Sequence, residues 1–245
     1  MIRGIVFDLD GTLLDHDGAE LAALSKLYPT LLDGDSGPRR WLPFRDFAAV
    51  WHDAAERGWQ RYVAGELSFA AQRTWRVQQV MALQDEAGDG RQPLTKQEVD
   101  DIFARYLTLY EESWSLYPDT LPCLEALSAY PLGMITNGDG AQQRQKLEQM
   151  GIAERFDSVV VSGDVGFAKP QREIFDRGAE ELGLAPNELL FIGDNPENDV
   201  LGAMQAGWHA IWLNRDGTRQ EVAALTVADL TDVPRLVVDG FPSER

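Results

Sequence analysis

The hydrophobic positions of this chain form two kinds of pattern, and the first is a set of short apolar runs. Five runs are rich in aliphatic side chains and show no clean alternation with polar ones: Gly4–Phe7, Leu132–Ile135, Ser158–Val161, Leu189–Ile192 and Ala210–Leu213. A strand that is covered on both faces has this pattern, which is typical of a parallel sheet. We therefore interpret the five runs as buried parallel strands.

Helical patterns follow the second, third and fourth of these runs. One helix is expected from Gly140 to Met150, because Asp139 can cap its start and Gly151 suits the left-handed position at its end. Proline is favoured as the first residue of a helix, which predicts helices from Pro170 to Leu182 and from Pro196 to Gly207. Strands that alternate with helices in this way predict a doubly wound α/β sheet.

The second kind of pattern, helical periodicity with few strand-like runs, occupies the stretch between the first and second predicted strands. Helices are expected at Ala19–Leu27, Pro43–Val63, Phe69–Leu83 and Thr95–Glu112, the last opening with a capping-box sequence. The sheet domain is therefore expected to be discontinuous. We predict a core of residues 1–15 plus 116–245 and an all-helical domain of residues 16–115 inserted after the first strand.

Composition narrows the possible partners. The 245 residues include 40 acidic and 22 basic side chains, a formal net charge of −18, which disfavours binding to nucleic acid or to an anionic membrane. The single cysteine, Cys123, excludes an intramolecular disulfide and fits a reducing compartment. No apolar run reaches the ~18 residues of a membrane helix, and we expect no leader before the first strand, because the start of the sequence has no basic segment and no leader-length apolar stretch. We expect a soluble cytoplasmic protein, a monomer or homodimer, whose partner is a small molecule.

Carboxylates stand at the ends of two predicted strands. Asp8 and Asp10 follow the first strand, and Asp194 and Asp199 follow the fourth. The carboxyl ends of the strands line the ligand-binding edge of a doubly wound sheet, so the four carboxylates are expected to converge. Like charges this close need a cation or a proton among them. Oxygen ligands without nearby His or Cys favour Mg²⁺.

Two further strand ends carry polar groups. Thr136-Asn137-Gly138 ends the second strand, and its hydroxyl and backbone N–H groups are suited to cradle an oxyanion or a phosphate. The third strand leads to Lys169, one of only four lysines in the chain. We expect this lysine to neutralise the carboxylates and a phosphoryl oxygen.

Taken in order, these motifs closely resemble those of the haloacid dehalogenase (HAD) superfamily of phosphohydrolases. The resemblance spans nearly the whole chain, and the inserted region resembles that family's helical cap. The first motif corresponds to Asp8-Leu9-Asp10-Gly11-Thr12, the second to Thr136, the third to Lys169, and the fourth to Gly193-Asp194 through Asp199.

One branch of the superfamily is the most similar in detail, the branch with pyrimidine nucleotidases and N-acylneuraminate 9-phosphatases. The details are the segments Ile135–Gly138, Gly166–Pro170 and Asp199–Ala203. This resemblance implies a Mg²⁺-dependent hydrolase of a small phosphate monoester, with a nucleoside monophosphate or a sugar phosphate as the expected substrate.

The resemblance also implies a role for each residue of the first motif. Asp8 would attack phosphorus and form an aspartyl-phosphate. Asp10 would protonate the leaving oxygen and then take a proton from the attacking water. Its backbone carbonyl would also bind the metal. We expect nearby carboxylates to raise the pKa of Asp10, so that it starts protonated.

The other motifs would complete the site. Asp194 would bind Mg²⁺ together with Asp8 and Asp10, and Asp199 would support the metal through water or orient Lys169. Thr136, the Asn137 N–H and Lys169 would hold the phosphoryl group. Specificity would come from the cap, where Arg39, Arg40 and Arg45 are weak candidates for binding an anionic group.

Other interpretations compete at two levels. Singly, Asp8 and Asp10 suit a turn, Asp194 and Asp199 suit helix starts, and Thr136 and Lys169 suit ordinary loop positions. For the whole chain, a phosphomutase shares the phosphatase core. A 2-haloacid dehalogenase would use Asp8 without a metal, but would not be expected to need Asp10 or the acidic pair of the fourth motif. A non-catalytic scaffold would be expected to have damaged motifs, and none is damaged.

Overall fold

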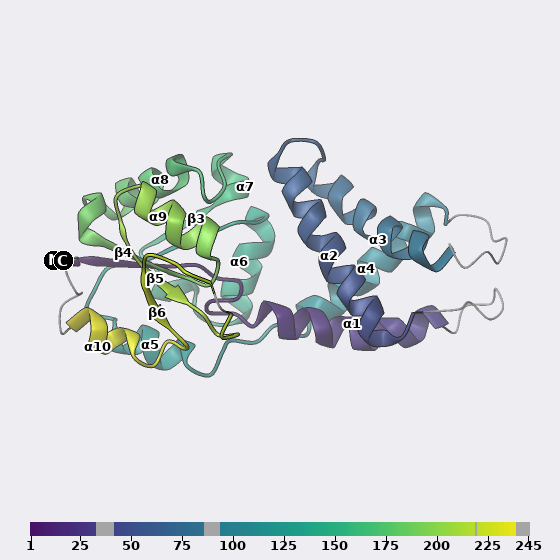
Figure 1. The fold of residues 1–245 in the computed structure, drawn as a ribbon, viewed down its shortest axis with the longest axis horizontal. Helices are drawn as coiled ribbons and strands as arrows, with labels where there is room; N and C mark the ends of the chain where they lie inside the picture. The colour runs from purple at the N-terminus through teal and green to yellow at the C-terminus, as the bar shows by residue number, and fades with distance from the viewer. Residues whose placement is uncertain (33–41, 86–93, 219, 239–245) are drawn as a thin grey trace. The chain divides into compact units, whose positions relative to one another are not determined.

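The computed structural model of the chain describes residues 1–32, 42–85, 94–218 and 220–238. Contacts divide the chain into two compact units, one of residues 1–16 with 114–245 and the other of residues 17–113. The first unit contains a sheet, and the second is helical (Figure 1). The α/β core and the helical insertion after its first strand, both predicted from the sequence, are confirmed. No helix in the described part of the chain is long and apolar enough to cross a membrane.

The sheet has six parallel strands in the order β3-β2-β1-β4-β5-β6. They are β1 Gly4–Phe7, β2 Leu132–Thr136, β3 Ser158–Val161, β4 Leu189–Gly193, β5 His209–Leu213 and β6 Leu225–Val227. The five predicted strands are thus present, and β6 was not predicted. The strand order reverses direction around β1, and the carboxyl ends of β1 and its neighbour β4 lie at that switch point, where doubly wound sheets bind ligands.

Helices pack on both faces of this sheet. In Figure 1, α8 and α9 lie on one side, and α5 and α10 lie on the other. The helices of this unit after the cap are α5 Thr120–Ala126, α6 Gly140–Gln149, α7 Ser162–Val165, α8 Arg172–Leu182, α9 Gly202–Gln205 and α10 Val233–Val238. Short 3₁₀ turns at Ala153–Arg155 and Pro186–Glu188 and a π-helical segment at Pro196–Leu201 complete the unit.

An aromatic cluster fills the core between α8 and the sheet. The ring of Phe175 on α8 meets Phe191 of β4 and Trp208 edge-on, at centroid distances of 5.5 and 5.8 Å. Such pairs contribute about 0.5–1.5 kcal/mol beyond their area burial. All three side chains are buried, so β4 is fixed against α8 directly below the loop that carries the fourth motif.

The predicted helix starts were right at one loop and wrong at another. Helix α6 begins after Asp139, whose side chain accepts a hydrogen bond from the backbone N–H of Gln142. Helix α8 begins at Arg172 and not at Pro170. The reason is a turn closed by the Gln171 N–H, which donates to the carbonyl of Ala168 and leaves Pro170 in the loop.

The second unit contains the helices α1 His16–Leu32, α2 Phe44–Val63, α3 Phe69–Asp85 and α4 Lys96–Glu111. Helix α4 starts with the predicted capping box: Thr95 and Glu98 each accept a hydrogen bond from the other's backbone N–H. Trp51 of α2 and Tyr106 of α4 are buried, with ring centroids 4.6 Å apart. The apolar stripe of α2 therefore packs inside this unit.

Candidate functional site

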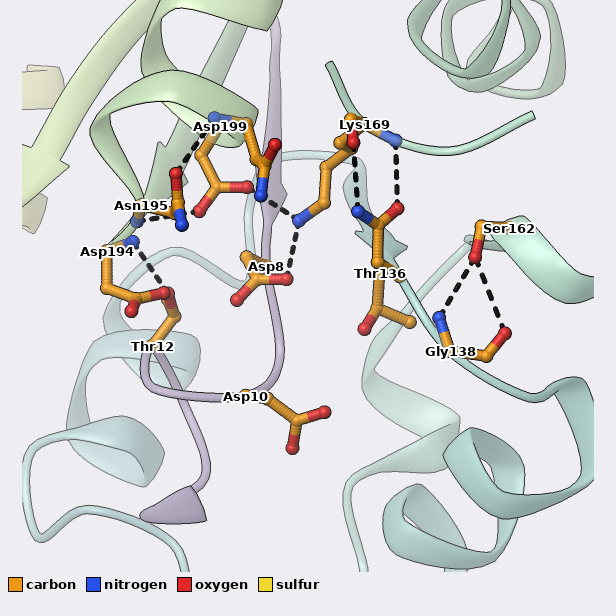
Figure 2. A network of polar contacts seen from close by, with 12 residues as sticks. Asp8, Asp10, Thr12, Thr136, Gly138, Ser162, Lys169, Asp194, Asn195 and Asp199 are labelled. Atoms are coloured by element: carbon orange, nitrogen blue, oxygen red, sulfur yellow. Dashed lines mark hydrogen bonds and ion pairs between the residues drawn. The ribbon is translucent and has the colours of Figure 1, made fainter. Parts of the chain in front are cut away.

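The side chain of Asp8 is buried at the end of β1 and is paired with a lysine. The backbone N–H of Asp8 donates to the carbonyl of Ile192, which extends the β1–β4 pairing to this residue. The Nζ of Lys169 lies 2.6 Å from Asp8 Oδ1 and 2.6 Å from Asp199 Oδ1, so one ammonium group bridges two carboxylates (Figure 2). The Lys169 side chain is only 3% exposed. Burial lowers the pKa of Lys169, but the charges of Asp199 and Asp8 and the hydrogen bonds to them together raise it above its ordinary value.

Asp194 is held by the loop that follows β1. Its backbone N–H donates to Thr12 Oγ1 at 3.1 Å, and the Thr12 hydroxyl lies 3.2 Å from Asp194 Oδ1. Gly11 adopts a φ of 84°, and a Cβ at this position would lie 2.5 Å from Asp194 Oδ2. Both the backbone conformation and the close approach of the carboxylate therefore require glycine here.

The fourth motif is fixed by its own hydrogen bonds. Asn195 caps the π-helical segment, because its side chain accepts from the N–H groups of Glu197 and Asn198. The N–H of Asn195 donates to Asp199 Oδ2 at 3.0 Å, and a Cβ at Gly193 would collide with the Asp199 side chain. The first turn after β4 thus directs Asp199 back toward Lys169 (Figure 2).

These residues form a set of hard oxygen donors. One carboxylate oxygen each from Asp8, Asp194 and Asp199 lies within 4.8 Å of the others. Burial raises the pKa of Asp8 to about 7 against the lowering effect of Lys169, and the charges of Asp199 and Asp10 add to the rise. Burial and the charges of Asp8 and Asp199 raise the pKa of Asp194 well above its ordinary value. Crowded carboxylates of this kind fit a divalent cation such as Mg²⁺.

Asp10 lies apart from this set, in a second polar cluster. Lys146 of α6 places its Nζ 2.7 Å from both carboxylate oxygens of Asp10, and Gln143 Nε2 donates to Asp10 Oδ2 at 2.9 Å. Burial raises the pKa of Asp10, but Lys146, His16 and the two hydrogen-bond donors together hold it below its ordinary value. The expectation that neighbouring carboxylates keep Asp10 protonated is therefore wrong for this arrangement, because a buried lysine is the nearest charge.

Some groups of the predicted phosphate cradle after β2 already form hydrogen bonds within the protein. The Thr136 hydroxyl accepts a hydrogen bond from Gln143 Nε2 at 2.7 Å. The Gly138 N–H, one of the backbone groups predicted for the cradle, donates to Ser162 Oγ at 2.9 Å (Figure 2). The Asn137 side chain donates to the Lys169 carbonyl and accepts from the Lys169 N–H, at 3.0 and 2.8 Å. This pair of bonds fixes the loop that carries Lys169.

The structure thus gathers the predicted residues into two clusters, and it adds residues that the sequence interpretation missed. Lys146 and Gln143 were not singled out, and Thr12 and Asn195 lay inside the first and fourth motifs but were given no role. A signal existed on α6, where Gln143, Lys146 and Leu147 recur at three- and four-residue spacing on the buried face. Of the arginine candidates, Arg45 is exposed on α2, and Arg39 and Arg40 lie outside the described residues.

Comparison with known proteins places this site in a family. The sequence profile of haloacid dehalogenase-like hydrolases matches residues 2–207. A phosphoserine phosphatase from Thermus thermophilus is 31% identical over 94% of this chain and 96% of its own length. The pyrimidine 5′-nucleotidase YjjG of Escherichia coli is 37% identical over 43% of this chain and 49% of its own length. An N-acylneuraminate-9-phosphatase from Rattus norvegicus is 24% identical, covering 96% and 94%.

Solved structures share the fold. The HAD-hydrolase YfnB from Bacillus subtilis superposes with a TM-score of 0.79 and 22% identity, covering 97% of this chain and 99% of the other. An L-2-haloacid dehalogenase from Xanthobacter autotrophicus gives a TM-score of 0.72 and 23% identity, covering 97% and 99%. The chain belongs to the haloacid dehalogenase-like hydrolase family, as its four motifs indicated.

Proposed function

We propose that this protein is a Mg²⁺-dependent phosphatase that hydrolyses a small phosphate monoester through an aspartyl-phosphate on Asp8. The observation that carries the proposal is the pairing of Asp8 with Lys169, with the carboxylates of Asp194 and Asp199 within 4.8 Å. A buried carboxylate beside an ammonium group and further acidic ligands is suited to attack a phosphoryl group that arrives with a cation.

In the first step, an oxygen of Asp8 forms a bond to phosphorus as the bond from phosphorus to the ester oxygen breaks. Asp10 donates a proton to the departing oxygen, which leaves as an alcohol. In the second step, Asp10 takes a proton from water, the water oxygen attacks phosphorus, and the bond to Asp8 breaks. Lys146 and the other neighbours of Asp10 hold its pKa below the ordinary value, so the carboxylate form suits the second step directly, and for the first step Asp10 must take up a proton.

Lys169 and the strand ends would hold the phosphoryl group during both steps. The Lys169 ammonium lies at Asp8 Oδ1, so it can contact an oxygen of a phosphoryl group on that carboxylate. Asn137 keeps the Lys169 backbone in place, while the Thr136 hydroxyl and the Asn137 N–H are our candidates for hydrogen bonds to the remaining oxygens. Phosphoryl transfer depends mostly on such positioning and charge neutralisation.

Mg²⁺ is proposed at the three-carboxylate set, where Asp8 and Asp194 would bind it with the backbone carbonyl of Asp10, supported by Asp199. When bound, the ion would neutralise phosphoryl charge. The donor chemistry supports this choice, since the cluster consists of carboxylate oxygens with raised pKa values at Asp8 and Asp194. The magnesium-bound YfnB structure is consistent with it.

The substrate class rests on the relatives. These relatives are named for activities on phosphoserine, pyrimidine 5′-nucleotides and an N-acylneuraminate phosphate, all of which are small phosphate monoesters. We keep a nucleoside monophosphate or a sugar phosphate as the proposed substrate. A phosphomutase on the same core would transfer the phosphoryl group to a sugar faster than to water. A dehalogenase would not be expected to need Asp194 and Asp199, the acidic residues that follow β4, for binding a metal.

The test is phosphate release from a panel of esters with Mg²⁺ and with EDTA. The panel holds an aryl phosphate, phosphoserine, nucleoside monophosphates, sugar phosphates, phosphoglycolate and an acylneuraminate phosphate, and halide release from a 2-haloacid is measured in parallel. Metal-dependent phosphate release from wild type, lost in Asp8→Asn, is the expected result. Metal-independent halide release without phosphate release would replace this proposal with the dehalogenase alternative.

A further inference from the structure

A lysine and a glutamine of α6 are buried against Asp10 in an arrangement that ordinary helix packing does not require. The Lys146 side chain is 3% exposed, and Gln143 is also buried. The same face of α6 buries Leu147, the kind of side chain that would satisfy packing at all three positions. A buried ammonium is costly unless it is paired and hydrogen-bonded, so its presence here indicates a specific partner.

That partner is the carboxylate of Asp10. Lys146 Nζ lies 2.7 Å from both of its oxygens, and Gln143 Nε2 lies 2.9 Å from Oδ2. Three contacts from two side chains on one rigid helix fix both the position and the rotation of the carboxylate. Gln143 Nε2 also donates to Thr136 Oγ1 at 2.7 Å, which ties Asp10 to the strand end that we assign to phosphate binding.

Each aspartate of the first motif is paired with a different lysine. Lys169 contacts Asp8 and Asp199, whereas Lys146 contacts Asp10, although Asp8 and Asp10 are only two residues apart. In Figure 2 the Asp10 carboxylate points away from the group formed by Asp8, Lys169 and Asp199. The nucleophile and the acid/base therefore have separate supports.

We propose that Lys146 and Gln143 are positioning residues that set the orientation of the Asp10 carboxylate for proton transfer to the leaving oxygen. This inference rests on the proposed function, in which Asp10 is the general acid and base. It predicts that removing either side chain lowers kcat/KM selectively for esters whose leaving oxygen needs a proton. Removing the carboxylate of Asp10 should have the same selectivity and a larger loss. A residue that only stabilised the fold would lower the turnover of every substrate by the same factor.

The test compares kcat/KM for two esters with different leaving groups, because this parameter reports the steps up to transfer of the phosphoryl group to Asp8. An alkyl phosphate needs a proton on its departing oxygen, whereas p-nitrophenyl phosphate releases a stabilised phenolate that does not. With Lys146→Met, we expect kcat/KM for the alkyl ester to fall about 10²–10³-fold, within the usual range for acid catalysis, and for the aryl ester less than about 10-fold. Gln143→Leu keeps Lys146 and should give the same selectivity with a smaller loss.

Three comparisons decide the outcome. Lys96→Met replaces an exposed lysine of α4 and should leave both esters unchanged. Asp10→Asn should show the same leaving-group selectivity, and adding Lys146→Met to it should cost little more, because both changes act through one group. Equal losses for the two esters in folded Lys146→Met and Gln143→Leu, beside selective loss in Asp10→Asn, would overturn the inference alone. Equal losses in Asp10→Asn would instead refute the acid role of Asp10 in the proposed function.

Discussion

The carboxylates of Asp8, Asp194 and Asp199 form an acidic set, and neutralising it with a cation offers the sharpest physical prediction. Asp194 has a carboxylate oxygen within 4.8 Å of oxygens of both Asp8 and Asp199, and the ammonium of Lys169 contacts those two and not Asp194. At an effective dielectric constant of about 20, each such pair repels by roughly 3 kcal/mol when both of its carboxyl groups are ionised. Bound Mg²⁺ would relieve this repulsion and should therefore stabilise the folded state.

The size of the effect follows from mass action. At about 100 times its Kd, a ligand that binds only the folded state adds about 2.7 kcal/mol. For a chain of this size, about 2–4 °C per kcal/mol gives a rise of roughly 5–10 °C in the first unfolding transition. The assay is thermal unfolding with and without millimolar Mg²⁺.

Asp194→Asn tests the origin of the shift. Asparagine keeps an oxygen for the Thr12 hydroxyl and removes one of the crowded charges, so the variant should melt at or above the wild-type temperature without Mg²⁺. Its response to Mg²⁺ should shrink to less than about 2 °C, whereas Asp53→Asn, on the exposed side of α2, should keep the full shift. A full Mg²⁺ shift in Asp194→Asn, or none in wild type, would refute the assignment of the ion to this set.

Three further changes test other parts of the structure. Lys169→Met should lower kcat about 10²–10³-fold in the folded variant, the usual effect of removing one transition-state contact, measured by phosphate release with circular dichroism to establish that the variant is folded. Gly11→Ala forces a side chain into a φ of 84° and toward Asp194, so it should cost roughly 1–3 kcal/mol in urea unfolding and reduce the Mg²⁺ shift. The hydrogen bond to Glu20 raises the pKa of His52 to about 9, so this pair adds stability that is full below the ordinary histidine pKa of 6.5 and is lost as pH rises through 9. His52→Gln should therefore flatten the pH dependence of cap stability between pH 6.5 and 9, and an unchanged slope would contradict that role.

The strands could be predicted because a parallel strand buried on both faces has a characteristic composition, a short run of aliphatic residues that is bounded by turn residues. The run from Gly4 to Phe7 is fully buried, as its apolar sequence indicated. The missed strand, β6, has only one buried residue of its three, Val227, so it has no such signature. The start of α8 was misplaced because Pro170 suits a helix start locally, and the turn that excludes it depends on contacts made after folding.

The candidate site, like the fold, could be predicted from the sequence only in part. Asp8, Asp194 and Asp199 could be placed together from the sequence, since each follows a strand and parallel strands end at one edge. The surroundings of Asp10 could not, because Lys146 lies 136 positions away and reaches it only through the packing of α6. Lys146, together with His16 and the hydrogen bond from Gln143, reverses the expected direction of the Asp10 pKa shift. Motifs identify reacting groups, whereas their protonation depends on neighbours that tertiary structure supplies.

Capture of the covalent intermediate would show directly whether Asp8 is the nucleophile. Enzyme, Mg²⁺ and the preferred ester from the panel are mixed, quenched in acid within a turnover, digested and examined by mass spectrometry. We expect one phosphoryl group on the peptide that carries Asp8, absent from Asp8→Asn, which should also release no phosphate. Phosphate release at a near wild-type rate by purified Asp8→Asn, or a phosphoryl group on another residue, would contradict it.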